Sequence, residues 1–199
     1  MTDFTRFTPQ HMSQIHQWIK GDLSFLPELP SDIKTKKEKA IIRKRQEDVW
    51  GQGILKEIRP DIQTSGQWTT LLGEMLAEYL YGRIGYTVTK PVKKENYQPD
   101  RETHEFLIEV KSQTYFTDGT AGEKILGVPF KYACLPELYG KPVKILCIGG
   151  AEKRCREEYG NLGGDRCAPA KKKMLDFYCE MGFEYIAASD LLKDLLVES

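Results

Sequence analysis

The sequence predicts an α/β or α+β fold in which helices flank a central mixed β-sheet. Helical periodicity dominates the chain up to Gly85, and strand-like segments alternate with helical ones from there to the C-terminus. The 199 residues, 40% of them hydrophobic, suffice for one sizeable core. We therefore expect a single domain spanning residues 1–199, of which residues 1–60 form a mainly helical N-terminal portion.

This N-terminal portion is expected to contain two helices. Residues 1 to about 30 combine apolar side chains with a proline-punctuated stretch at 25–30, which predicts a short helix and then a loop. A second helix is expected from Ser31, and it contains basic runs at residues 34–39 and 43–45. Both a solvated helix face and a phosphate-contacting face are compatible with such runs.

Apolar residues at helical spacing indicate a further helix before Gly85. Thr64 and Ser65 can cap its start, and Gly82 and Gly85 end it. The spacing is typical of an amphipathic helix. Its apolar positions are Trp68, Leu71, Leu72, Met75, Leu76, Tyr79 and Leu80.

Strands are expected from residue 86 onward. Residues 86–92 carry β-forming side chains, and a polar turn region follows as far as Pro99. Residues 105–115 alternate, which predicts a strand with one buried face and one face that carries chemistry. The first face holds Phe106, Ile108 and Val110, and the second holds Leu107, Glu109, Lys111 and Gln113.

The last third of the chain continues the alternation of strands and helices. Residues 143–148 form an apolar segment closed by two glycines, which predicts a central strand. Pro169 can open a helix that runs to about residue 181. Residues 183–187 predict another strand, and Ser189 can cap a final helix through Leu196.

Charge and hydropathy restrict the functional classes. Basic and acidic residues number 29 each, so a nucleic-acid site must come from local clustering of charge. No apolar run approaches the about 20 residues of a membrane helix, and the first residues lack a secretory pattern. We expect a soluble, cytoplasmic protein without a membrane partner. Five dispersed cysteines without a CxxC pair predict reduced thiols.

Three residues suit phosphodiester hydrolysis. That reaction needs a divalent cation on oxygen ligands, an activated water and positive charge near the transition state. Glu109 and Lys111 lie two residues apart on the expected strand, so both project from one face, roughly 6 to 7 Å apart. A turn near residues 101–104 would fold a short strand ending at Asp100 back beside Glu109.

These residues carry a family resemblance. Pro99-Asp100, then eight residues, then Glu109-Val110-Lys111 resembles the PD-(D/E)XK signature of restriction-endonuclease-like nucleases. The family has a helix with an early glutamate before this strand, and the segment that begins Gly73-Glu74 resembles it. Residues 118–132 resemble a block found in some type II restriction endonucleases. The resemblance implies a restriction-endonuclease-like fold.

The resemblance also implies roles for the central residues. Asp100 and Glu109 would bind Mg²⁺, and the carbonyl of Val110 could add a ligand. Lys111 would orient the attacking water or stabilise the charge of the transition state.

Further residues are assigned more loosely. Glu74 would complete the site through a water or a second ion, a choice over Glu78 that rests on the resemblance alone, since the helical wheel does not favour Glu74. Gln113 could contact a phosphate, although an ordinary polar strand residue is the more common explanation for a glutamine at such a position. Lys124 and Lys131 could reach phosphates or base edges.

Together with these residues, the resemblance implies a Mg²⁺-dependent type II restriction endonuclease that cleaves a specific short site in double-stranded DNA as a homodimer. Another nuclease of the same type remains an alternative: a junction resolvase, a nicking enzyme or a repair endonuclease. Alternatives of other classes are a non-catalytic DNA-binding module and a metabolic α/β enzyme. No nucleotide cofactor is expected, because residues 117–124 lack the GxxxxGK[ST] order.

Overall fold

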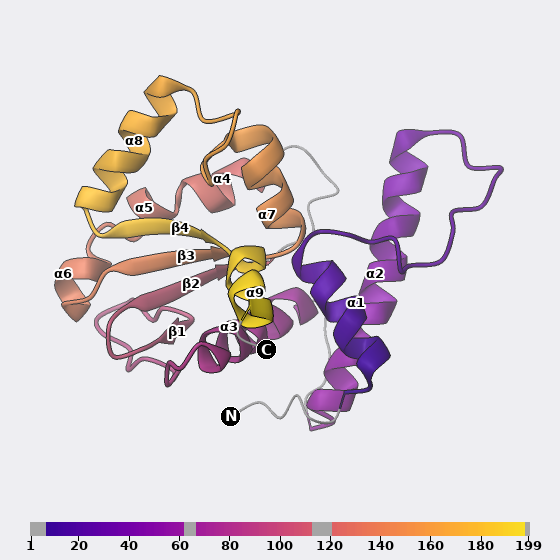
Figure 1. Ribbon diagram of the computed structural model, residues 1–199, viewed down its shortest axis with the longest axis horizontal. Helices are drawn as coiled ribbons and strands as arrows, with labels where there is room; N and C mark the ends of the chain where they lie inside the picture. Colours follow the sequence, from indigo (N-terminus) through magenta and orange to yellow (C-terminus); the bar gives the residue numbers. More distant parts are fainter. Residues whose placement is uncertain (1–6, 62–66, 113–120, 198–199) are drawn as a thin grey trace.

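The computed structural model describes residues 7–61, 67–112 and 121–197, and within them a mixed sheet with helices on both faces (Figure 1). The strand order is β1-β2-β3-β4. Strand β1 is antiparallel to β2, whereas β2, β3 and β4 run parallel to one another. The predicted mixed sheet flanked by helices is therefore confirmed.

The elements of the described chain have the following bounds. The strands are β1 (Arg101–Glu102), β2 (Leu107–Lys111), β3 (Val143–Cys147) and β4 (Phe183–Ala187). The α-helices are α1 (Pro9–Ile19), α2 (Lys36–Ile58), α3 (Trp68–Arg83), α4 (Ala121–Leu126), α5 (Val128–Lys131), α6 (Leu135–Tyr139), α7 (Gly150–Arg154), α8 (Pro169–Glu180) and α9 (Ala188–Val197). A π-helix, η2 (Cys155–Tyr159), continues α7.

Helix α2 begins at Lys36, later than the expected start at Ser31. A capping box fixes this start, because the Thr35 hydroxyl accepts from the Glu38 amide while the Glu38 carboxylate accepts from the Thr35 amide. The expected cap of α3 at residues 64 and 65 lies outside the described residues. No helix of the described ranges combines the length and the apolarity that crossing a bilayer requires.

The prediction of a strand at residues 86–92 is wrong. Only Thr89 pairs there, through an isolated antiparallel bridge to Glu102, and Pro91 has no amide to donate to a ladder. The short strand that folds back beside Glu109 does exist, but it consists of Arg101–Glu102, where a turn was expected. The reversal follows it, where the Thr103 hydroxyl accepts from the amides of residues 105 and 106.

Both faces of β2 are buried, and they join different hydrophobic clusters. The face with Phe106, Ile108 and Val110 packs in the larger cluster, which includes residues of α1, α2, α3 and α9. Leu107 on the other face belongs to the smaller cluster, which includes residues of α4, α5 and α6. The predicted alternation holds over β2, which is shorter than the expected strand at 105–115; residues 113–115 lie outside the described residues, and the face of Glu109 is also buried. Strand β3 lies between β2 and β4, as expected for a central strand.

Candidate active site

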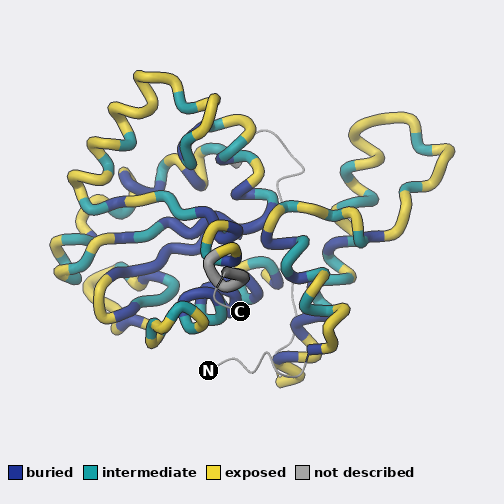
Figure 2. Tube along the Cα trace, viewed as in Figure 1, coloured by how far each residue is buried: buried dark blue, intermediate teal, exposed yellow. Residues whose placement is uncertain are grey.

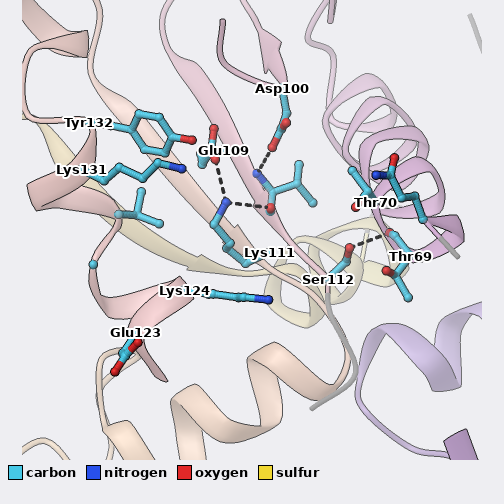
Figure 3. A pocket seen from close by; sticks show the side chains of 14 residues that line it. Thr69, Thr70, Asp100, Glu109, Lys111, Ser112, Glu123, Lys124, Lys131 and Tyr132 are labelled. Atoms are coloured by element: carbon cyan, nitrogen blue, oxygen red, sulfur yellow. Dashed lines mark hydrogen bonds and ion pairs between the residues drawn. The ribbon is translucent and has the colours of Figure 1, made fainter. Parts of the chain in front are cut away.

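A pocket of about 670 Å³ opens where β2 ends, between the first turn of α3 and helices α4 and α5 (Figure 3). Asp100, Glu109, Val110 and Lys111 all line it. The carboxyl ends of parallel strands are a common place for ligand sites, because loops and helix ends converge there. The fold thus brings together in one pocket the residues that the sequence analysis assigned to the centre of an active site.

Asp100 is joined to β2 through its side chain. Its Oδ2 accepts a hydrogen bond of 2.7 Å from the Val110 amide. Asp100 directly precedes β1, which pairs with β2 from Arg101 onward. The strand pairing and this bond together hold the carboxylate beside the middle of β2. Asp100 and Val110, ten residues apart in the sequence, are therefore in direct contact in the fold.

Glu109 and Lys111 form an ion pair on β2. The Lys111 ammonium donates to Glu109 Oε1 at 2.7 Å and to the Val110 carbonyl at 3.2 Å. Glu109 is only 5% exposed. Burial raises the pKa of its carboxyl group, the negative charge of Asp100 raises it further, and Lys111 and Lys131 act in the opposite direction. Two acidic groups thus share a partly dehydrated site with cations close by.

The oxygen atoms of this site suit a hard cation. Two carboxylates and the Val110 carbonyl converge there, and the Lys111 ammonium is bound by oxygens of the same set. Within the described ranges, no group of three or more His, Cys, Asp or Glu side chains is arranged to hold a metal. Mg²⁺ commonly uses one or two carboxylates and keeps several waters, so the donor set fits Mg²⁺.

Glu74 and Glu78, the two alternatives on α3, lie together around one arginine. Arg101 binds Glu78 Oε1 through Nε at 2.7 Å and binds Glu74 through Nη1. The same guanidinium donates to the Asp100 carbonyl at 2.7 Å. Neither glutamate is among the described residues that line the pocket. In the structure Glu74 is therefore paired with Arg101 and does not line the pocket that holds Asp100 and Glu109.

The two lysines expected to contact DNA do line the pocket. Lys124 and Lys131 reach it from α4 and α5. The Lys131 ammonium lies 4.6 Å from the centre of the Tyr132 ring. Tyr132 raises the pKa of Lys131, and the negative charges of Glu109 and Asp100 add to the effect. Gln113 lies outside the described residues.

The sequence reasoning missed the contribution of α3 to the pocket. Thr69 and Thr70 line it, and the Ser112 hydroxyl donates to the Thr69 carbonyl at 2.6 Å. This contact requires a glycine at position 73, because a Cβ there would stand 2.4 Å from the Ser112 hydroxyl oxygen. Gly73, inside an otherwise apolar helical pattern, was the available signal for a close approach between α3 and β2.

No family model, curated protein or solved structure matches this chain. The resemblance to PD-(D/E)XK nucleases accordingly rests on residues of the chain itself. Of these, Asp100, Glu109 and Lys111 meet in space, and Glu74 does not join them.

Proposed function

We propose that this chain is a Mg²⁺-dependent endonuclease of the PD-(D/E)XK type that hydrolyses phosphodiester bonds in double-stranded DNA. The single observation that supports this most is the convergence of Asp100, Glu109 and Lys111 in one pocket. The sequence order of these residues matches the family signature, and their geometry matches the chemistry. Within this class we propose a type II restriction endonuclease, because residues 118–132 resemble a block of such enzymes.

Each residue has a definite task in this proposal. Asp100, Glu109 and the Val110 carbonyl would hold Mg²⁺, which supplies a Lewis acid and a bound water of lowered pKa. Lys111 would bring its ammonium to the scissile phosphate, where it orients the water and stabilises developing negative charge. Lys124 and Lys131, on the opposite wall, would bind non-bridging or neighbouring phosphate oxygens.

The test is cleavage of unmethylated plasmid and phage DNA by the purified protein, with and without Mg²⁺. Discrete fragments that require Mg²⁺ and vanish in Glu109→Gln are the expected result, whereas the exposed control Glu28→Gln should cut normally. Smeared or merely nicked products would favour another nuclease of the same type. Binding without cleavage would favour a non-catalytic DNA-binding module, and inert DNA would contradict the proposal.

We further propose that the protein acts as a homodimer and that α8 forms its interface. Two symmetric sites are a simple way to cut both strands of a duplex. No residue of α8 is buried, and Met174 and Phe177 are 57% and 56% exposed. With Met181 they recur at helical spacing and form an apolar stripe on the outside of the molecule.

The charges beside this stripe suit a second copy of the same helix. Lys173 and Glu180 are seven residues apart, so they lie on the same flank of α8. In an antiparallel two-fold pairing, Lys173 of one protomer therefore meets Glu180 of its partner, and the pair occurs twice. This self-complementarity favours a second copy over an unrelated partner.

Sedimentation velocity tests the α8 interface. Phe177→Glu should convert the dimer into a monomer, because it places two charges in the apolar contact. Val92→Glu is the matched control, since Val92 is 77% exposed on another part of the molecule. A wild-type monomer, or a Phe177→Glu dimer, would contradict this interface.

A further inference from the structure

Helix α2 has two halves with different surroundings. Its buried residues all lie from Glu47 onward, in the half that packs against the larger hydrophobic cluster. Residues 27–46, which we call the arm, contain no buried residue. Figures 1 and 2 show this part projecting from the body of the molecule with an almost wholly accessible surface.

The arm is nevertheless a defined structure. The capping box of Thr35 and Glu38 starts its helix, as described above. The Pro27 carbonyl accepts from Arg43 at 2.8 Å and from Gln46 at 3.1 Å, which attaches the preceding loop to the helix. A projecting helix without apolar burial gains little from packing, so its persistence depends on these local contacts.

The charge of the arm is unlike that of the rest of the chain. Residues 34–45 contain seven Lys or Arg and one Glu, a net charge of +6 in a chain whose net charge is zero. The whole arm, which also contains Glu28 and Asp32, carries +4, and the rest of the chain therefore carries a net charge of −4. Surfaces that serve only solubility usually mix both signs, because a block of like charges repels itself. A predominantly basic block on a projecting helix is typical of a surface for a polyanion.

We propose that the arm binds the phosphate backbone of the DNA duplex, outside the pocket at the end of β2 and without reading sequence. The inference rests on the proposed function for the identity of the polyanion. Strands β2, β3 and β4 point toward the side of the molecule from which the arm projects (Figure 1). A duplex whose scissile phosphate enters the pocket is tens of ångströms long, so its flank extends beyond the pocket.

Salt dependence of DNA binding tests the arm directly. Each phosphate neutralised by a lysine contributes about 0.9 to the slope of log affinity against log salt concentration. The variant Lys36→Gln/Lys37→Gln/Lys39→Gln should lower this slope by about 2 to 3 and weaken binding roughly tenfold or more, equally for all duplex sequences. Because these side chains are exposed, its melting temperature should match that of the wild type.

The control removes three exposed lysines elsewhere, as Lys56→Gln/Lys90→Gln/Lys93→Gln, and should leave the slope nearly unchanged. Binding is measured by fluorescence anisotropy of a labelled duplex without Mg²⁺, and cleavage is measured separately at saturating enzyme. An arm variant that cuts at the wild-type rate when saturated, but with a lowered slope, supports both proposals. Equal slopes in all three proteins, or no binding by the wild type, would overturn the arm proposal.

The two proposals can also fail separately. Mg²⁺-dependent cleavage by the wild type, with the same salt slope in the arm variant, would support the endonuclease proposal and contradict a role of the arm in DNA binding. A lowered slope in a protein that cleaves no DNA would support the arm as a nucleic-acid surface and contradict the endonuclease.

Discussion

Two buried glutamates of this chain have different environments and, we argue, different uses. Glu47 is fully buried in the helical region, where its Oε1 accepts a 2.6 Å hydrogen bond from the Trp18 indole. Its other oxygen has no hydrogen-bond partner among the described residues. Glu109 is almost as buried, but it pairs with the Lys111 ammonium and lines a pocket.

The comparison shows that burial alone does not distinguish a carboxylate that lines a pocket from one that is enclosed in the core. Burial raises the pKa of Glu47 to about 7, and the indole hydrogen bond only partly opposes it. Burial also raises the pKa of Glu109, yet Lys111 and Lys131 stabilise its charged form. Glu47 is thus a structural group that takes up a proton near neutral pH, whereas Glu109 has cations and an opening through which a substrate can approach.

The largest expected effect is the loss of cleavage in Glu109→Gln. Removing the negative charge should reduce Mg²⁺-dependent cleavage by at least about 100-fold, while DNA binding stays within a few-fold of the wild type. The melting temperature should stay equal or fall slightly, because the variant loses the ion pair with Lys111 but also the repulsion between Glu109 and Asp100. Single-turnover cleavage and anisotropy measure the two properties. Full cleavage by this variant would contradict the proposed role of Glu109 in binding Mg²⁺.

This part of the site was predictable because it depends on local rules. Glu109 and Lys111 share a strand face by the two-residue period, and Asp100 needed only a short reversal to reach them. The position of the reversal was less predictable. The Thr103 side chain forms it after β1, so the residues expected to turn are the ones that pair.

The next effect concerns the pH dependence of stability. The folded-state pKa of Glu47, about 7, lies above the ordinary value of 4.5, so the folded protein binds the proton more tightly. Stability contributed by this group is therefore full below about pH 4.5 and is lost as the pH rises through 7. Glu47→Gln should raise the free energy of unfolding by on the order of 3 kcal/mol at pH 8.5 and by little at pH 5.

Urea denaturation at both pH values measures this difference, with the exposed Glu28→Gln as a matched control. Equal stabilisation of Glu47→Gln at both pH values would mean that the carboxyl group of Glu47 does not titrate between them. Cleavage should be unchanged in this variant, because Glu47 lies outside the pocket lining.

Glu47 and the arm show what the sequence could not provide. The basic runs of α2 were visible, but their projection from the body depends on where the helix meets the core, and this begins only at Glu47. Likewise, the family resemblance assigned Glu74 rather than Glu78 to the site, whereas in the fold both glutamates form ion pairs with Arg101. Ion pairing between residues of different elements is a tertiary property, and no periodicity in one segment encodes it.

The smallest expected effect tests whether Glu74 is a structural group, like Glu47, or belongs to the proposed active site, like Glu109. Arg101 carries one positive charge between the carboxylates of Glu74 and Glu78, so Glu74→Gln leaves a balanced pair with Glu78. We expect cleavage to fall less than tenfold, through small shifts of Arg101 and of the Asp100 carbonyl that it binds. Glu78→Gln is the matched control and should behave alike. If Glu74→Gln alone lost cleavage as completely as Glu109→Gln, the DNA complex would have to release Glu74 from Arg101 into the site.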